Sequence, residues 1–396
     1  MAKPERAPIR FIAIGLAALA ASCAPRGVAP VAPAAPVATA GPVLHLVVDA
    51  GSSGTRFCVF RVDVTDQGCA SPEPVGDCLK TTDGRGLHTY SPAEAKTLFA
   101  TQLTALRQRG AIAGAVVLGT GGFRDAAGQI DRGRPGMEAL WAAVRAELAA
   151  HGIPAVARPI EGQEEGRLGW LSVARNLQPS SGFSTIEIGG ATCQLATAPN
   201  PKAGFAEVRA VSDLIGLNAT WTRFASRKDV FAPCSSGDPE STKGQDAEAC
   251  ATLIGKEVFA PSRLFATPLA SDERQRPVYV LGAPWTGVFD RFVARLHPAQ
   301  KDQVTLGELE GLAQKYCRLK ASEITTEAKT YEPARTCFTL AYEVAFLRAT
   351  LGTDDPAGKA INGQESWPRG ASATGLTGKT DLTDPSKPES LFADCH

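Results

Sequence analysis

Two segments of the chain repeat one design, and this repeat constrains the fold more than any other feature of the sequence. Residues 46–60 read LVVDAGSSGTRFCVF, and residues 183–197 read FSTIEIGGATCQLAT. Each contains an apolar run, an acid, a turn of glycine and other small residues, and a second apolar run, which together predict a β-hairpin. Because one hairpin stands near the start of each half of the chain, we expect two lobes related by duplication.

Short β-rich runs and helical segments alternate after each hairpin. In the first half, residues 91–110 and 134–152 have helical periodicity and flank the strand-like run AGAVVLGT. Such alternation favours α/β lobes, and a chain of 396 residues that is 44% hydrophobic can form two cores. We place an N-terminal α/β lobe at residues 43–178 and a C-terminal α/β lobe at 179–396, whose last segment is free to pack back on the first lobe.

The N-terminus predicts export. Three basic residues precede the apolar run 11–22, which is too short to span a bilayer and is typical of a signal peptide at residues 1–22. Small residues before Cys23 favour lipidation of that cysteine, while ordinary cleavage nearby would give a soluble or secreted protein. Residues 23–42 are rich in alanine and proline and predict a tether. We therefore expect a location in the periplasm or cell envelope.

Export would let disulfides persist. By spacing, we expect three pairs among the ten cysteines: Cys69 with Cys78, Cys234 with Cys250, and Cys317 with Cys337. Cys58 and Cys193 lie in strand-like runs, where we expect buried thiols. The spacings do not follow the C-x-x-C pattern of zinc sites.

The charge balance excludes a general attraction to nucleic acid. Lysine plus arginine equals aspartate plus glutamate, at 41 each, so any anion site must be local. We expect a monomer whose membrane contact is limited to a lipid on Cys23.

The two Gly-rich turns are candidate phosphate loops. Small residues at 51–55 leave backbone N–H groups uncovered, and Asp49 is placed to hold a divalent cation on the same phosphate. A tight turn without a ligand is the alternative for one such loop. Since the acid and small residues recur at Glu187 and 189–192, we favour a clamp for a chain of phosphates.

Two other segments offer polar residues. The turn GTGGFR carries Thr120 and Arg124, and a helical segment begins near Glu161, Glu164 and Glu165. Each acid could simply complement the helix dipole, or one could be a general base for phosphoanhydride hydrolysis. Arg56 and Arg124 could contact phosphate, but an arginine that follows a turn is more often a solvated or ion-paired surface residue, and we expect that for both.

Four motifs resemble, in order, the first conserved regions of the apyrase family, the nucleoside triphosphate diphosphohydrolases. They are DAGSSGTR (49–56), GTGGFR (119–124), GQEEGRLGW (162–170) and IEIGGATCQLA (186–196). Weaker similarity to later family segments lies in VLGAPWTGVFD (280–290) and around Trp367. The resemblance implies an α/β, two-lobed actin-like (ribonuclease H-like) fold with the active site in the inter-lobe cleft.

The resemblance also implies residue roles. Glu165 matches the general base, and Thr192 and Gln194 match residues that place the attacking water. Asp49 and Glu187 match acids that hold Mg²⁺, Ca²⁺ or Mn²⁺ through its water shell. The matched phosphate-binding positions are Ser52, Ser53, Gly54, Thr120, Gly189, Gly190 and Ala191.

The chain departs from the family pattern in places. Glu187 and Thr192 stand where the family has aspartate and serine, so the metal geometry is the feature most open to change. The aromatic residue that would stack on a base has two candidates, Trp285 and Phe289.

These observations imply an exported, metal-dependent hydrolase that releases phosphate from nucleoside tri- and diphosphates. An exopolyphosphatase or guanosine pentaphosphate hydrolase is the first alternative, because it shares the superfold and similar loops. A catalytically inactive, nucleotide-binding envelope lipoprotein is the second, because actin-like folds also serve as binders.

Overall fold

The computed structural model describes residues 42–62, 72–81, 83–266, 273, 275–294, 302–328, 332–352, 357–363 and 366–374. All of them belong to one compact unit, Ala40–His396. The expected signal peptide, Cys23 and all but the last residue of the tether lie outside the described residues.

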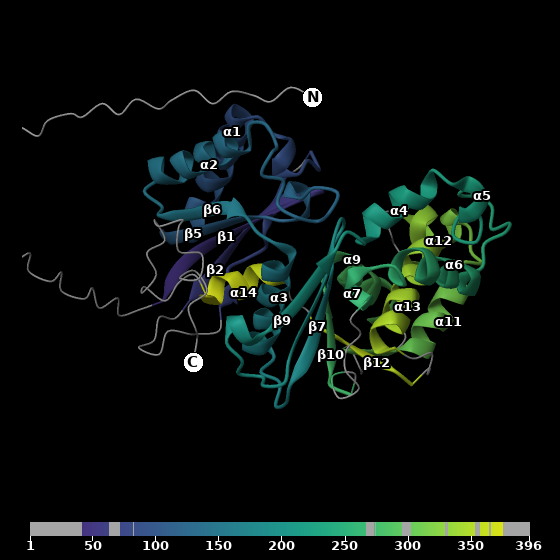
Figure 1. The fold of residues 1–396 in the computed structure, drawn as a ribbon. Coiled ribbons are helices and arrows are strands. Elements are labelled where there is room, and N and C mark those ends of the chain that lie inside the picture. Colours follow the sequence, from purple (N-terminus) through teal and green to yellow (C-terminus); the bar gives the residue numbers. More distant parts are fainter. Residues whose placement is uncertain are drawn as a thin grey trace, which may run out of the picture. The chain divides into compact units, whose positions relative to one another are not determined.

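The first sheet contains the first hairpin (Figure 1). Its strands are β1 (Val43–Gly51), β2 (Gly54–Val62), β3 (Glu73–Pro74), β4 (Leu79–Lys80), β5 (Ile112–Gly119) and β6 (Ala155–Pro159), in the order β3-β2-β1-β5-β6 with β4 also on β2. Helices α1 (Pro92–Leu106) and α2 (Met137–Ala150) pack on one face, where Phe99, Leu103 and Trp141 join the strand residues in a buried core. Ser91 and Glu94 form a capping box at the start of α1.

The second sheet has the order β11-β12-β10-β7-β8-β9. Its strands are β7 (Phe183–Ile188), β8 (Cys193–Ala198), β9 (Arg209–Asp213), β10 (Val278–Leu281), β11 (Gln303–Thr305) and β12 (Lys359–Asn362). The helices of this half are α4 (Leu217–Ala225), α5 (Lys228–Phe231), α6 (Ala247–Ile254), α7 (Arg263–Ala266), α9 (Ala283–Val288), α11 (Leu306–Tyr316), α12 (Ala321–Ala328) and α13 (Thr336–Leu351). Short π-helical turns extend α6 over Gly255–Phe259 and α9 over Phe289–Val293. Within the described residues, no helix is both long and apolar enough to cross a membrane.

The two sheets repeat one topology. In each, a central strand (β1 or β7) pairs antiparallel with the strand that follows it and parallel with a later strand (β5 or β10). This arrangement confirms both predicted hairpins and the α/β class. It also brings the acid of each copy to the carboxyl end of its central strand, next to the Gly-rich turn.

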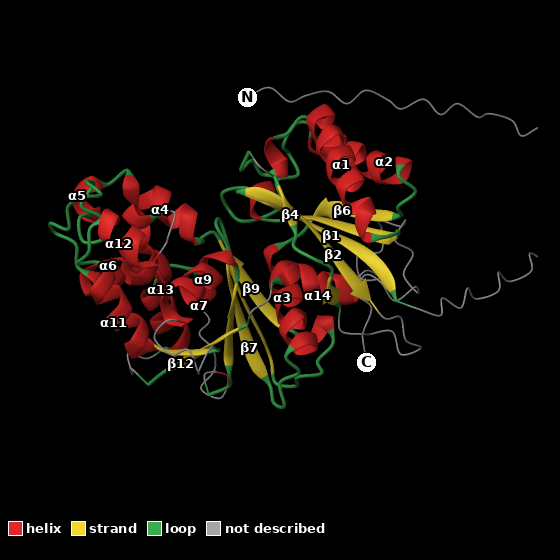
Figure 2. Ribbon diagram, turned by 180° about the vertical axis from the view of Figure 1, so that it is seen from behind, coloured by secondary structure: helices red, strands yellow, loops and turns green. Residues whose placement is uncertain are grey.

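Helix α3 (Gly162–Asn176) and helix α14 (Trp367–Thr374) connect the two halves of the sequence. Helix α3 precedes the lobe boundary that we expected at residue 178, yet it packs against β7, β8 and β9. Helix α14 packs along α3 and also contacts β1 and β2, so the C-terminal segment does return to the first sheet. Figure 2 shows the same two helices side by side from the opposite direction.

The disulfides confirm two of the three predicted pairs and correct the third. Cys234–Cys250 and Cys317–Cys337 form as expected, and Cys193 is a buried free thiol. Cys78, however, bonds Cys58 and not Cys69, which lies outside the described residues. The expectation that Cys58 is a buried thiol was therefore wrong. The cause is strand pairing: Phe57 is opposite Leu79, so the next pair along β2 and β4 is Cys58 with Cys78, with Cα atoms 4.3 Å apart.

The contact between α14 and α3 depends on a glycine. A Cβ atom added to Gly370 would lie 1.9 Å from the carbonyl oxygen of Leu168 on α3. We expect Gly370→Ala to lower the free energy of unfolding by about 1–3 kcal/mol, because the helices would have to separate. Chemical denaturation of the purified protein measures this change.

The matched control is Gly311→Ala on α11, where an added Cβ meets no atom within 4 Å. There the substitution should stabilise by about 0.5–1 kcal/mol, because alanine favours a helix over glycine. Equal effects of the two substitutions would contradict the close α14–α3 contact.

Candidate functional site

One pocket of about 390 Å³ brings together most of the site residues expected from the sequence. Its lining includes parts of both sheets and their Gly-rich turns. The expected residues in the lining are Asp49, Ser52, Ser53, Gly54, Thr120, Glu165, Glu187, Gly189, Gly190, Ala191 and Thr192. Arg56, Lys80, Asn218 and Glu332 also line it, and sequence reasoning assigned none of these four to a site.

The Gly-rich turns approach one another in this pocket. A Cβ atom added to Gly190 would lie 3.5 Å from the hydroxyl oxygen of Ser53, and one added to Gly121 would lie 3.1 Å from the Cβ atom of Ala191. The absence of side chains therefore lets three turns converge. Among the described residues, the backbone N–H groups of Ser52, Ser53, Gly190 and Ala191 have no hydrogen-bond partner. Uncovered amides of this kind bind anions such as phosphate.

Helix α4 holds the second turn in place. The N–H of Leu217 donates to the carbonyl of Gly189 at 3.0 Å, and the N–H of Asn218 donates to that of Gly190 at 2.8 Å. The first amides of the helix thus bind the carbonyl side of the turn. The amide side of the turn is left for a ligand.

Glu165 lies in the first turn of α3 and is 6% exposed. Its Oε2 atom accepts a hydrogen bond from Arg124 Nη2 at 2.6 Å and one from Gln194 Nε2 at 3.1 Å. No described residue donates to Oε1. Burial raises the pKa of Glu165, and the adjacent Arg124 opposes that rise. The side chain therefore has one oxygen fixed by donors and the other without a donor among the described residues.

The structure places Arg124 differently from what the sequence led us to expect. Far from being a surface arginine, it has a fully buried side chain that also donates to the carbonyl of Ile160 from Nε and Nη2, at 3.3 and 3.2 Å. These bonds attach the turn after β5 to the start of α3. The sequence around Arg124 did not indicate this burial, because Glu165, its ion-pair partner, lies 41 residues further along the chain.

Gln194 and Thr192 lie beside Glu165. Gln194 Nε2 donates to Thr192 Oγ1 at 2.9 Å as well as to Glu165, while its own Oε1 is buried without a partner in the described structure. Thr192 lines the pocket, whereas Gln194 does not and contacts it through Thr192 and Glu165. A hydroxyl and a carboxylate so placed can together orient a water molecule.

Asp49 and Glu187 provide the acidic wall of the pocket. Both are buried, and each keeps one carboxylate oxygen, Asp49 Oδ1 and Glu187 Oε2, without a hydrogen-bond partner among the described residues. Burial, followed by the charges of Glu165 and Asp49, raises the pKa of Glu187 well above its ordinary value. Orphaned carboxylate oxygens of this kind suit a hydrated divalent cation. The described residues contain no cluster of three His, Cys, Asp or Glu side chains that could bind a metal directly.

Arg56 partly neutralises this wall. It stands opposite Asp49 in the hairpin, and its Nε donates to Asp49 Oδ2 at 3.0 Å while its Nη2 forms an ion pair with the same oxygen. The charges of Asp49, Glu187 and Glu165 all raise the pKa of the guanidinium. Arg56 is therefore ion-paired, as expected, but it lies in the pocket.

The two nucleobase candidates do not reach the pocket. Trp285 and Phe289 are 0% and 2% exposed and belong to the hydrophobic core of the second half of the chain. The apolar spacing that suggested them is the buried face of α9 and its π-helical turn. Trp367, the one aromatic residue in the described lining, is 1% exposed, and its backbone N–H acts to lower the pKa of Glu187. The described pocket thus offers no accessible aromatic ring for a base.

No protein-family model matches the chain, and no curated protein sequence matches it. Solved structures do. A Ppx/GppA family member of Aquifex aeolicus matches with a TM-score of 0.58 and 15% identity over 84% of this chain and 97% of its own. An exopolyphosphatase from Cytophaga hutchinsonii matches with a TM-score of 0.56 and 14% identity, over 84% and 97% of the two chains.

A nucleoside triphosphate hydrolase from Neospora caninum is similar to a comparable degree. It has a TM-score of 0.53 and 14% identity, and the match covers 90% of this chain and 96% of that one. At such identities the likeness concerns the fold. The chain has the two-domain actin-like α/β fold of these proteins, with two sheets of repeated topology.

Proposed function

We propose that this protein is a metal-dependent hydrolase that removes the terminal phosphate from a phosphoanhydride chain. The observation that carries the proposal is Glu165, a buried carboxylate fixed by Arg124 and Gln194 in a pocket lined by two amide-rich turns. Neighbours of the same fold include phosphate-releasing enzymes that act on polyphosphate and on nucleoside triphosphates.

In this proposal, the turns at 51–54 and 189–192 bind the phosphates through their free amides. Thr192 and Glu165 orient a water molecule on the far side of the terminal phosphorus. Glu165 Oε1 takes the proton as the water oxygen bonds to phosphorus, and the bond to the bridging oxygen breaks. Arg124 and Gln194 keep the carboxylate ionised and oriented until then.

Asp49 and Glu187 would hold the divalent cation, through water, by their orphaned oxygens. The cation supplies charge neutralisation to the phosphate chain when bound. The charge of the lining supports the requirement for a cation, because the lining contains two basic residues and four acids: Asp49, Glu165, Glu187 and Glu332. A polyanionic substrate would otherwise meet a negative pocket.

Two substrate classes fit the site, and each has an observation in its favour. The motif resemblance to apyrases favours nucleoside tri- and diphosphates. The lack of an accessible aromatic ring in the described lining, together with the Ppx/GppA likeness, favours polyphosphate or guanosine pentaphosphate. A site that binds the phosphates and makes little contact with the base would account for both observations.

We also propose that the protein is exported. Three disulfides in the described residues are typical of oxidising compartments. Lipidation at Cys23, location in the periplasm or envelope, and a monomeric state remain parts of this proposal.

The Glu165→Gln variant tests the general base. It should lower kcat for phosphate release by roughly 10²–10⁴-fold, because the amide cannot take the proton. The control is Glu164→Gln: the neighbouring acid bonds Arg158 at 2.8 Å and does not line the pocket, so activity should stay within a few fold. Substantial phosphate release by Glu165→Gln would remove this residue from the mechanism.

The pH profile tests Arg124. Its charge lowers the pKa of Glu165, and Glu165 must be ionised to act. In Arg124→Met the pKa of Glu165 should therefore rise and move the acid limb of kcat/KM upward by roughly 1 pH unit or more. Arg124→Lys should keep the limb nearer its original place. A limb that stays fixed in the methionine variant would show that another group controls it.

A phosphate-release screen tests the substrate and the metal. Wild-type protein would be assayed with ATP, GDP, guanosine pentaphosphate, tripolyphosphate and long-chain polyphosphate in Mg²⁺, Mn²⁺ or Ca²⁺, with chelator as control. We expect chelation to abolish turnover and kcat/KM for ATP and tripolyphosphate to agree within roughly tenfold, since no ring stacks on the base. A strong preference for ATP would indicate a base site, and one for long chains an exopolyphosphatase. Binding without turnover in every metal would favour the inactive lipoprotein.

A further inference from the structure

Lys80 is a basic residue of the pocket that the proposed mechanism does not use. The described lining contains two basic side chains, and one of them, Arg56, is paired with Asp49. Lys80 is exposed, and none of the described carboxylates forms an ion pair with it. An uncommitted ammonium group therefore lies at the edge of a pocket built for phosphate.

Strand register determines where Lys80 lies. Asp49 is opposite Arg56 across β1 and β2, and Arg56 is opposite Lys80 across β2 and β4. Residues directly opposite one another in adjacent strands project from the same face of a sheet. The three charges thus form one row, which leads outward from the acidic wall through Arg56 to Lys80.

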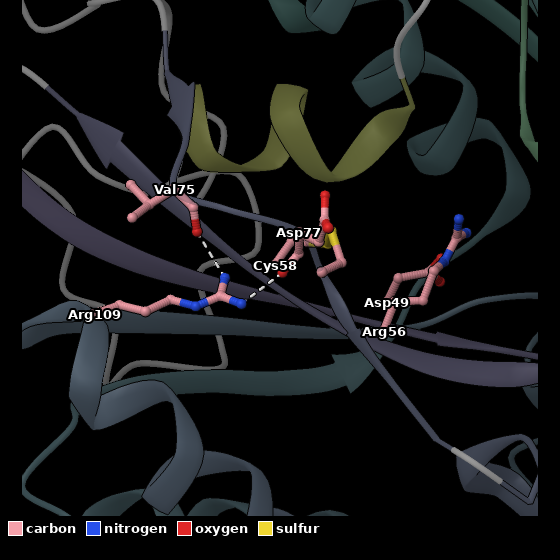
Figure 3. Close-up of a disulfide and its surroundings, with 7 residues drawn as sticks. Asp49, Arg56, Cys58, Val75, Asp77 and Arg109 are labelled. Carbon is pink, nitrogen blue, oxygen red and sulfur yellow. Dashed lines mark hydrogen bonds and ion pairs between the residues drawn. A yellow bond between two sulfur atoms is a disulfide. The ribbon is translucent and has the colours of Figure 1, made fainter.

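The segment that carries Lys80 is fastened at several points, although β4 is only two residues long. Cys78 is bonded to Cys58, two positions along β2 from Arg56. Arg109 donates to the carbonyls of Val75 and Asp77, both at 2.7 Å. Figure 3 shows Arg109 reaching these carbonyls beside the disulfide, with Asp49 and Arg56 further along the sheet.

Next to Lys80, the segment is attached to the first phosphate turn itself. The N–H of Thr81 donates to the carbonyl of Thr55 at 3.0 Å, and the N–H of Thr55 donates to Thr81 Oγ1 at 3.2 Å. Lys80 therefore has a fixed backbone position relative to the turn at 51–54. Without the disulfide, a two-residue edge strand would keep that position only through these hydrogen bonds and those of Arg109.

We propose that Lys80 is a substrate-binding residue that contacts the phosphates beyond the one released, and that the Cys58–Cys78 disulfide positions it. The inference rests on the proposed function, because it assigns Lys80 to the same phosphate chain. Its ligand is an anionic chain of two or more linked phosphates, whose oxygens accept charge-assisted hydrogen bonds from the ammonium group. The shorter anion, inorganic phosphate, occupies the inner turns and does not reach Lys80.

Kinetics with tripolyphosphate and ATP test the assignment. Lys80→Ala should raise KM by roughly three- to tenfold with kcat within twofold, as expected for one exposed ionic contact. Lys80→Arg should restore most of the affinity, and the inhibition constant of inorganic phosphate should not change. The control Lys202→Ala removes an exposed lysine that does not line the pocket, and should leave KM unaltered. The proposal would be overturned if KM did not change in Lys80→Ala, or if the inhibition constant of inorganic phosphate rose by the same factor as KM.

A binding measurement separates this proposal from the proposed function. Calorimetric titration of wild-type and Lys80→Ala protein with tripolyphosphate in Mg²⁺ should show the same loss of affinity, whether or not the wild type hydrolyses any substrate. Absence of turnover would then count against the hydrolase alone. Equal affinities would count against Lys80.

The role of the disulfide is tested by Cys58→Ser/Cys78→Ser. This variant should reproduce the rise in KM, and adding Lys80→Ala should change KM by less than twofold more. The control Cys234→Ser/Cys250→Ser removes a disulfide of the second half and should keep KM. Fully additive effects would show that Lys80 acts independently of the disulfide. If the first variant does not fold, Arg109→Met can be used instead, because it removes two hydrogen bonds to the same segment and should also raise KM. An unchanged KM in Arg109→Met would then contradict the idea that the segment positions Lys80.

Discussion

The buried ion pair between Arg124 and Glu165 is the interaction on which the site depends. It joins the turn after β5 to the start of α3, and Gln194 extends it to β8 in the second sheet. A buried carboxylate near Asp49 and Glu187 would be costly without a partner, because burial disfavours its charge. The pair keeps that charge in place and, in the same contact, determines which oxygen faces the pocket.

The two hairpins share a topology but differ in charge. In the first, the residue opposite the acid is Arg56; in the second, the residue opposite Glu187 is Gln194. One copy therefore neutralises its acid within the hairpin, while the other directs a neutral amide to Glu165. The two copies thus share the strand order and the Gly-rich turn, and the cross-strand partner of the acid is what distinguishes them.

The sequence was sufficient for the parts of the fold governed by local pattern. Alternating apolar runs and Gly-rich turns predicted β1, β2, β7 and β8, and the motifs located most residues of the pocket. It was insufficient where distant strands meet. The bond between Cys58 and Cys78, the buried position of Arg124 and the row that ends at Lys80 all follow from pairing between segments, which spacing does not encode. Trp285 and Phe289 failed for a related reason, since apolar helical spacing does not distinguish a core residue from a ligand contact.

Helix α14 has a consequence for the order in which the molecule is completed. Its first residue, Trp367, lines the pocket together with Glu187, and its Gly370 lies against α3, which carries Glu165. A ribosome synthesises these residues after Glu165 and both Gly-rich turns. A nascent polypeptide that already contains both phosphate turns and Glu165 therefore still has an open acidic wall. The pocket is completed after translation has passed residue 370, so the chain contains Glu165 and both Gly-rich turns before it has the wall that Trp367 adds.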